Sequence, residues 1–283
     1  MIKRTISGRN GKGSLAHNRR AFETENVDKT RVHLNIKYCD ENLKAVYHEL
    51  FDSAVERYNV GKRNDRKITD YYEKIRQSKQ EKLFHEVIFQ IGNCTDTAVG
   101  TEEGELAVKI LDEYMKEFQK RNPSLRVFSC HLHLDESTPH LHVDFVPYVT
   151  GWKGKGMDTR VSLKQALKSL GFEGGSKQDT ELNQWINHEK EVLAEIALQH
   201  GIEWEQKGTH EEHLDVYNFK KKSVKKKCRH WNRRKNISQQ RMKVLIARLQ
   251  KQGQISSSWK KKWFDFRKIK RQQKNVPRKQ NRN

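Results

Sequence analysis

The sequence has few cysteines, and none of them forms a pair. Its four cysteines are spread along 283 residues with no CxxC spacing, at Cys39, Cys94, Cys130 and Cys228. Disulfide frameworks and zinc knuckles need cysteines at short, regular spacings. We therefore expect four reduced thiols, and both classes of small cysteine-stabilised domain are excluded.

Long apolar runs are also missing. Hydrophobic residues make up 34% of the chain and the mean hydropathy is −1.01. No segment is long and apolar enough to cross a bilayer, and the N-terminal stretch MIKRTISGRNGKG lacks the apolar centre of a signal peptide. We therefore expect a soluble protein of the bacterial cytoplasm with no membrane segment.

Acidic residues are almost absent from the C-terminal part. Residues 219–283 carry 25 Lys and Arg against one acidic residue, Asp265, which makes this segment +24, whereas residues 1–218 hold 32 basic and 35 acidic residues. Basic side chains interleaved with tryptophan and phenylalanine favour nucleic acid as a partner, although runs of charge are also common in solvated tails. We predict a body of residues 1–205, then a linker and a basic arm, residues 206–283. The arm residues expected to contact nucleic acid are Lys225, Lys226, Lys227, Arg233, Arg234, Lys260, Lys261 and Lys262.

The body alternates between helical and strand periodicity. Residues 1–14 read as irregular. Helices are predicted at 14–26, from a cap at Asp40 to Gly61, through Tyr72 and Ile75, at 101–123, at 162–171 and at 182–200. Strands are predicted at 30–38, 83–92, 126–134 and 140–149. Neighbouring strands joined by a short turn indicate an α+β domain: an antiparallel sheet with helices on one face.

The stretch HLHLDESTPHLHVDFVP, residues 131–147, contains four of the chain's thirteen histidines. Alternate side chains of a strand share a face, so a hairpin would bring His133 beside His140 and His142. Three imidazoles on rigid strands suit a divalent cation, although a solvated sheet face rich in histidine is the simpler alternative. Asp135 and Glu136 in the turn could orient a ligand, bind the metal or take a proton.

Strand parity also divides the first strand of this hairpin into two rows. Val127, Ser129, His131 and His133 are predicted to point to the metal face, and Phe128, Cys130 and Leu132 to the core. His131 shares the metal face but lies one pleat further from the turn, so it is left outside the predicted ligand set.

Two motifs resemble those of one family. HLDESTPHLHVDFVP resembles the histidine motif of MobV-type relaxases, the Pre/Mob plasmid mobilisation and recombination enzymes. LAHNRRAFETEN…DKTRVHLN is similar to that family's first motif. The resemblance covers roughly residues 1–200 and leaves the basic arm outside. It implies the HUH endonuclease fold, with a central antiparallel sheet that carries metal-binding histidines and helices packed behind it.

The resemblance also implies a reaction. Such enzymes nick and rejoin one DNA strand at an origin of transfer to mobilise a plasmid or another mobile element. It implies a metal held by His133, His140 and His142, with Mn²⁺ or Mg²⁺ favoured by the family and Zn²⁺ by the ligand chemistry. Glu136 would complete the site or accept a proton, and Asp135 would orient a ligand.

The nucleophile lies outside the histidine motif. The residue that matches the catalytic histidine of the MobV type is His17, whose attack would leave a 5′-phosphate bonded to the protein. From the residues alone His17 could equally be an exposed helix histidine, and a tyrosine could replace it. The tyrosines of the N-terminal part are Tyr38, Tyr58, Tyr71 and Tyr72.

Further residues of the first motif are candidates for DNA binding. Arg19, Arg20 and Arg31 are expected to bind phosphate, although ordinary surface arginines would look the same in the sequence. His33 and Asn35 share a face of the strand predicted at 30–38 and are expected to shape the DNA cleft. DNA is the expected partner, with a second copy of the chain or the conjugation machinery as further candidates.

Three other functions fit part of the sequence. A rolling-circle replication initiator or transposase of the same class would use a tyrosine, so the amino acid in the DNA adduct discriminates. A non-catalytic nucleic-acid-binding protein with a structural zinc would not nick plasmid. A zinc hydrolase of small substrates would have no use for the basic arm.

Overall fold

The computed structural model describes residues 1–22 and 25–206. The α-helices are α1 Leu15–Asn18, α2 Leu43–Asn59, α3 Tyr71–Arg76, α4 Glu102–Lys116, α5 Phe118–Arg121, α6 Leu163–Ser169 and α7 Glu181–Gln199. The strands are β1 Ile2–Arg4, β2 Ile6–Asn10, β3 Ile36–Asp40, β4 His85–Ile91, β5 Leu125–His133, β6 His140–Val149, β7 Arg160–Val161 and β8 Ile202–Trp204. Two 3₁₀ helices, η1 Val32–Leu34 and η2 Asn64–Arg66, complete these elements.

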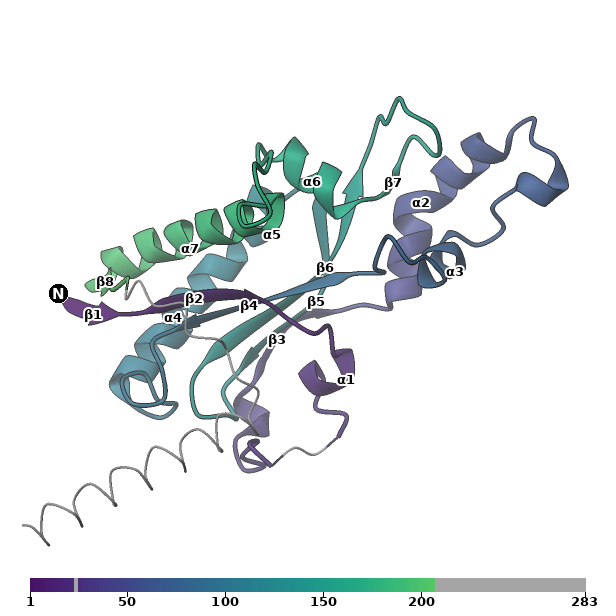
Figure 1. Ribbon diagram of the computed structural model, residues 1–283. Coiled ribbons are helices and arrows are strands. Elements are labelled where there is room, and N and C mark those ends of the chain that lie inside the picture. The colour runs from purple at the N-terminus through teal and green to yellow at the C-terminus, as the bar shows by residue number, and fades with distance from the viewer. Residues whose placement is uncertain (23–24, 207–283) are drawn as a thin grey trace, which may run out of the picture. The chain divides into compact units, whose positions relative to one another are not determined.

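The main sheet is antiparallel throughout, with β6 at its centre. Its order is β2-β4-β6-β5-β3, and β7 pairs with the end of β6 (Figure 1). The predicted hairpin forms between β5 and β6. A separate parallel pair joins β1 to β8, so the two ends of residues 1–206 lie side by side. The α+β prediction is thereby confirmed.

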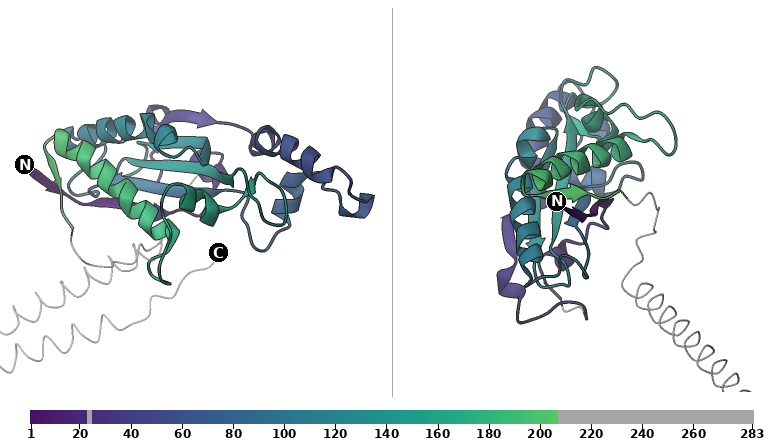
Figure 2. Two further views of the ribbon diagram at one scale, coloured as in Figure 1. Left: turned by 90° about the horizontal axis from the view of Figure 1, so that it is seen from above. Right: turned by 90° about the vertical axis from the view of Figure 1, so that its left-hand side faces the viewer.

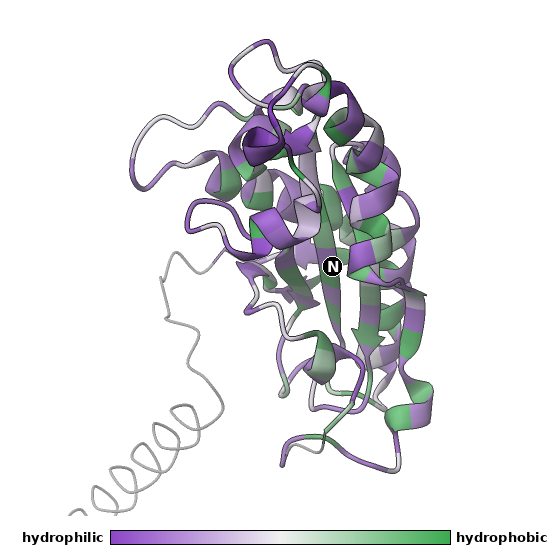
Figure 3. Cartoon of the chain, turned by 90° about the vertical axis from the view of Figure 1, so that its right-hand side faces the viewer, coloured by the Kyte–Doolittle hydropathy of each residue, from purple (hydrophilic) through white to green (hydrophobic). Residues whose placement is uncertain are grey.

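One face of the sheet is buried under helices. The helices α4 and α7 run across it, as Figures 1 and 2 show from different sides. Large side chains that are at most 1% exposed fill this layer: Phe89 and Phe145 from the sheet, Tyr114 from α4 and Trp185 from α7. In Figure 3 hydrophobic colour gathers on the strands and on the helix surfaces that face them. The opposite face carries the polar side chains of the site, and a second apolar cluster covers the far end of the hairpin on it.

A second apolar cluster holds α2 and α3. Phe51 of α2 and Tyr71 of α3 meet edge to face at a ring-centroid distance of 4.9 Å, and Phe128 and Val146 contribute from the far end of the hairpin. The helix α2 begins at a cap made by Asn42, whose side chain accepts from two backbone N–H groups, and not at Asp40 as predicted. Among the described residues no helix is long and apolar enough to span a membrane.

The N-terminal segment was predicted wrongly as irregular. Residues Ile6–Asn10 form β2, which pairs with β4 from Ile6 opposite Ile91 to Asn10 opposite Val87. Polar residues and Gly8 hide the strand pattern. A Cβ at Gly8 would lie 3.1 Å from the side chains of Ile186 and Lys190 in α7, so the absence of a side chain lets α7 approach this edge.

The segment 30–38 was predicted as one strand, and this is wrong for its first half. Val32–Leu34 form η1, and β3 begins at Ile36. The Asp28 side chain accepts from the backbone N–H and the hydroxyl of Thr30, which favours a turn over an extended chain. His33 and Asn35 therefore do not share a strand face.

A β-bulge reverses the predicted parity at one end of β5. The register shifts between Val127 and Ser129. Val127 therefore belongs to the core under α4 and α7, and Phe128 to the second apolar cluster, the reverse of the prediction. A bulge adds one residue to a strand, and strand periodicity gives no sign of it. From Ser129 onward the predicted alternation holds.

Two predicted helices differ in extent. The helix at 14–26 is limited to Leu15–Asn18, because Arg20 turns into the left-handed region with φ of 54°. The helix at 101–123 is divided at Glu117 into α4 and α5.

Candidate functional site

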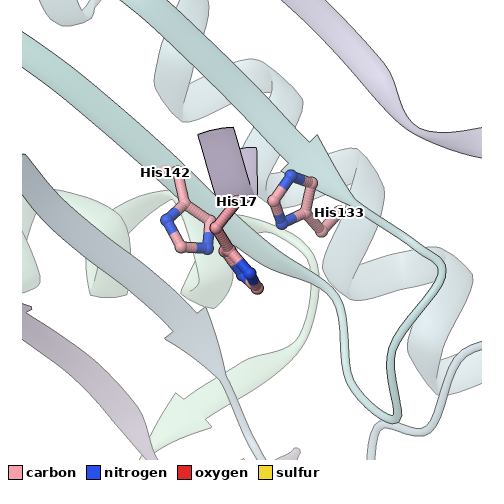
Figure 4. A group of neighbouring side chains, drawn as sticks. All are labelled: His17, His133 and His142. Carbon is pink, nitrogen blue, oxygen red and sulfur yellow. The ribbon is translucent and has the colours of Figure 1, made fainter. Parts of the chain in front are cut away.

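His17 lies at the end of α1 and faces the histidines of the sheet. Ser14 begins this short helix, and its hydroxyl accepts from the His17 N–H. The His17 ring centroid is 5.9 Å from that of His133 and 5.8 Å from that of His142 (Figure 4). A side chain from the first motif thus meets the second motif, more than a hundred residues away.

The three predicted histidine ligands converge. His133 and His140 are opposite each other in the β5–β6 register, and His142 is one pleat further along β6. Their ring centroids are 4.7 Å apart for His133 and His142, 5.0 Å for His140 and His142, and 5.3 Å for His133 and His140. The ring of His140 is fixed by its Nδ1, which lies 2.8 Å from the Thr138 carbonyl oxygen and leaves Nε2 as the free nitrogen.

The rings of His133 and His142 are each fixed by one nitrogen. His133 Nε2 donates to the Asn18 carbonyl oxygen at 3.0 Å, and His142 Nδ1 donates to Glu86 Oε1 at 2.6 Å. The other nitrogens, His133 Nδ1 and His142 Nε2, are buried and have no hydrogen-bond partner in the described part of the chain. One nitrogen bound to an acceptor and one free is the usual arrangement of metal-binding histidines.

These donors fit a divalent cation. Two groups have ligand atoms within 4.8 Å of one another: His133, Glu136 and His140, and His17, His133 and His142. Burial lowers the pKa of His133 and of His140, and lowers that of His142 to about 4. The imidazoles are therefore neutral at pH 7, which is the form that binds metals.

Arg20 links the two motifs. Its guanidinium donates to Asp135 Oδ2 at 2.8 Å and Oδ1 at 2.6 Å, to Glu136 Oε1 at 2.9 Å and to His17 Nε2 at 3.1 Å. A non-glycine residue in the left-handed region costs on the order of 1 kcal/mol, and such strain concentrates at functional sites. The Asn35 amide also donates to Asp135, at 2.7 Å. The turn that carries both acids is thus tied to the first motif.

Glu136 lies between the possible nucleophile and the metal ligands. Its Oε1 is 3.6 Å from His17 Nε2 and 3.8 Å from His140 Nε2. Its Oε2 accepts from the Asn26 side chain at 2.8 Å. The carboxylate is therefore positioned for either role that the sequence suggests.

Three buried polar residues of the site were missed by sequence reasoning as functional residues. The Asn18 amide donates to Glu86 Oε1 and to Asp144 Oδ2, both at 2.9 Å. Burial alone would raise the pKa of Glu86, but hydrogen bonds from His142, Asn18 and the Gly13 N–H hold it at about 2. Burial and the neighbouring Glu86 raise the pKa of Asp144 to about 7. The only sign of Glu86 in the sequence is one acid within the apolar run HEVIFQI.

The remaining predicted residues lie apart from this centre or already have partners. Arg19 pairs with Asp40 at 2.7 Å, and Arg31 with Asp28 at 2.9 Å, while His33 is exposed. The predicted DNA contacts of the basic arm lie outside the described residues: Lys225, Lys226, Lys227, Arg233, Arg234, Lys260, Lys261 and Lys262.

The four candidate tyrosines have other contacts. The Tyr38 hydroxyl donates to Asp112, and the Tyr71 hydroxyl accepts from the Val161 N–H. Tyr72 packs on Tyr47, and Tyr58 lies under Lys62. Within the described residues, none of the four has a recorded hydrogen bond or ring contact with the histidine centre.

Comparison with known proteins places these motifs in a family. A family model described as plasmid recombination enzyme matches residues 11–221. A plasmid recombination enzyme of Streptococcus agalactiae is 26% identical over 174 residues, which cover 56% of this chain and 30% of the relative. One of a Bacillus species is 24% identical over 226 residues, which cover 76% of this chain and 44% of the relative. The matched region thus spans less than half the length of these relatives.

Solved structures show similarity at a lower level. The manganese-bound relaxase domain of MobM with 22 nucleotides of pMV158 origin-of-transfer DNA, crystallised at pH 5.5, is 22% identical with a TM-score of 0.46. The similarity covers 77% of this chain and 98% of that one. A second crystal structure, at pH 4.6, is 21% identical with a TM-score of 0.48, and the coverage is 77% and 99%.

Proposed function

Because this chain belongs to the family of plasmid recombination enzymes, we propose that it is a metal-dependent relaxase that nicks and rejoins one DNA strand at an origin of transfer. The observation that carries this proposal is the meeting of His17 with the buried histidines His133 and His142 of the hairpin, each of which has a free ring nitrogen. A nucleophile and a metal ion that act on the same phosphate group must both reach it at once. The proximity of His17 to the hairpin histidines supports this.

His17 is the proposed nucleophile. Burial is the largest cause that lowers the pKa of His17, and the charge of Arg20 is the second, so the neutral imidazole dominates at pH 7. Its Nε2 lone pair accepts from Arg20 and becomes available for attack when that bond opens. Attack on phosphorus forms an N–P bond and breaks the P–O3′ bond. The departing oxygen takes up a proton and becomes a 3′-hydroxyl, and the 5′-phosphate stays on His17. The reverse reaction rejoins the strand.

We propose that His133, His140 and the Glu136 carboxylate hold the cation, with the free Nε2 of His142 as a further donor. A bound divalent cation would withdraw charge from a non-bridging phosphate oxygen and so stabilise the transition state. The carboxylate in this set favours Mn²⁺ or Mg²⁺, whereas the imidazoles alone would also suit Zn²⁺.

The hydrogen-bonded residues around the site position these groups. Glu86 directs the free nitrogen of His142 into the site, and Asn18 holds both Glu86 and His133. Arg20 fixes Glu136 beside His17, and Asp135 fixes Arg20. Because Asn18 and Arg20 follow His17 within three positions, nucleophile and metal ligands are positioned through one short segment.

DNA is the proposed substrate. Phe22 is 50% exposed, and its ring centroid lies 6.4 Å from that of His17, so a base next to the scissile phosphate can stack on it. The basic arm would supply sequence-independent affinity. Binding of a second copy of the chain or of the conjugation machinery stays a prediction.

A nicking assay tests the proposal. Supercoiled plasmid carrying the chain's own genetic locus, incubated with the protein and Mn²⁺ or Mg²⁺, should be converted to open circles that carry bound protein. EDTA and the His17→Ala variant should each abolish the bound protein. His48→Ala, which changes an exposed histidine of α2, is the matched control and should behave as the wild type. If the wild-type protein leaves its own locus intact with either metal, the proposal is wrong.

A further inference from the structure

The two groups of possible metal ligands differ in chemistry and share one residue. The first, His133, Glu136 and His140, contains a carboxylate. The second, His17, His133 and His142, contains three imidazoles and includes the proposed nucleophile. His133 offers a single free nitrogen, Nδ1, because its Nε2 is bonded to the Asn18 carbonyl oxygen. An ion bound to one group therefore occupies the nitrogen that the other group needs, so the two groups cannot hold an ion at the same time.

The all-imidazole group has the donor set of a zinc site. Zinc prefers four tetrahedral ligands, and three histidines with an open fourth position are a common arrangement. The nitrogens of such a site lie about 3.4 Å apart, and those of the second group are within 4.8 Å of one another. Rotations of the three side chains would bring their nitrogens to the shorter separation. The His17 side chain is 25% exposed, so water can reach the fourth position.

Carboxylates offset the positive group beside the second group. Arg20 donates to His17 Nε2 at 3.1 Å, and its guanidinium is also paired with Asp135 and Glu136. Glu86 adds a further negative charge behind His142. The carboxylates of Asp135, Glu136 and Glu86 therefore compensate the charge of a divalent ion bound to the neutral imidazoles.

We propose that His17, His133 and His142 form a zinc-binding set that withdraws the nucleophile. The nitrogen lone pair that binds zinc is not available to attack phosphorus, so zinc-bound protein is inactive. Because His133 is shared, zinc and manganese compete. The expected loss of activity rests on the proposed role of His17 in nicking, whereas the expected binding of zinc does not depend on that role.

The test measures metal affinity and not activity. Zinc and manganese dissociation constants are determined by chelator competition for the full-length wild type, His17→Ala, Glu136→Gln and the control His48→Ala. Loss of an outer-shell partner of a metal ligand costs on the order of 10–100-fold in affinity, so loss of a ligand should cost at least tenfold. We expect His17→Ala to weaken zinc at least tenfold and to leave manganese unchanged, and Glu136→Gln to do the reverse. Zinc that binds elsewhere in the chain contributes equally to all four proteins, so it does not change the comparison of their affinities.

Unchanged zinc affinity in His17→Ala, with manganese binding intact to show that the variant is folded, would overturn the inference. Equal weakening of both metals would also overturn it, because a single site would then be indicated. These outcomes are separate from the nicking assay: the wild type can nick its locus with manganese whether or not zinc uses His17. Zinc that binds without displacing manganese would contradict the shared role of His133.

Discussion

At the scale of single residues, the site depends on which nitrogen of each histidine is already engaged. Glu86 is 4% exposed and holds His142 Nδ1 at 2.6 Å, so only Nε2 can bind a metal. An anionic partner also makes the ligand nitrogen more basic. Glu86 therefore contributes to metal affinity without touching the metal.

Replacing Glu86 with Gln tests this role. The variant keeps the size of the side chain but removes the charge, so affinity for manganese should fall on the order of 10–100-fold. Chelator competition or calorimetry measures it. The control is Glu113→Gln, which removes a carboxylate paired with His200 on the helical side. Equal affinity in the two variants would show that Glu86 has only a structural part.

The sequence predicted some of these residues and not others, for a physical reason. Strand parity is a local property, so the convergence of His133, His140 and His142 follows from a single hairpin. Asn18 and Glu86 meet across 68 positions, and no local period reports such a contact. His17 was found through the family resemblance, since composition gives one histidine no role.

At the scale of elements, β4 carries a partly buried histidine, His85, that should make stability depend on pH. Burial, with a smaller effect from Lys82, lowers the pKa of His85 to about 4 from 6.5. Between these values the unfolded chain binds a proton that the folded chain does not. Stability is therefore highest above pH 6.5 and falls toward pH 4, by about 3 kcal/mol at most for this group.

Urea unfolding at pH 7.0 and 4.5, with EDTA present, measures this loss. His85→Gln should lose less stability than the wild type on acidification, because its side chain does not titrate. His48→Gln, exposed on α2, is the control and should lose as much as the wild type. Other buried histidines contribute in all three proteins. Identical losses in all three would refute the assignment to His85.

The helices on the covered face share a buried carboxylate. Glu189 of α7 is 1% exposed and accepts from the Tyr114 hydroxyl, from Asn122 Nδ2 at 2.9 Å and from Arg121 Nη2 at 3.2 Å. Glu189→Ala leaves these donors without an acceptor and should lower the free energy of unfolding by about 3 kcal/mol. Glu191→Ala, exposed on the same helix, should change it by less than about 0.5 kcal/mol. Denaturant titration decides, and a cost below about 1 kcal/mol would be inconsistent with this network.

Elements with a strong period were predictable, and interrupted ones were not. The helices α2, α4 and α7 and the strands β4, β5 and β6 follow runs of apolar residues at regular spacing. The strand β2 does not follow such a run, because Gly8 and polar residues fill its positions. Pairing with β4 supplies its stability instead. A side chain that bonds to a distant backbone, as Asn35 does to Leu134, likewise overrides the alternation around η1.

At the scale of the whole molecule, charge is divided between a nearly neutral body and the basic arm. Deleting residues 219–283 removes a net charge of +24. Since counterion release drives such binding, DNA affinity should fall and its dependence on salt should become shallower. Nicking of an oligonucleotide at low salt should survive. Fluorescence anisotropy at several salt concentrations measures both quantities, and an unchanged salt slope would rule out this role for the arm.

The central claim is that His17 attacks the phosphate beside a metal held by the hairpin. The most direct measurement is mass spectrometry of the peptide that remains attached to DNA after nicking of the chain's own locus with Mn²⁺. We expect a 5′-phosphate linked to His17 through an acid-labile bond to nitrogen. A 5′-phosphate linked to a tyrosine, or an unmodified His17 in nicked product that carries the protein, would contradict it.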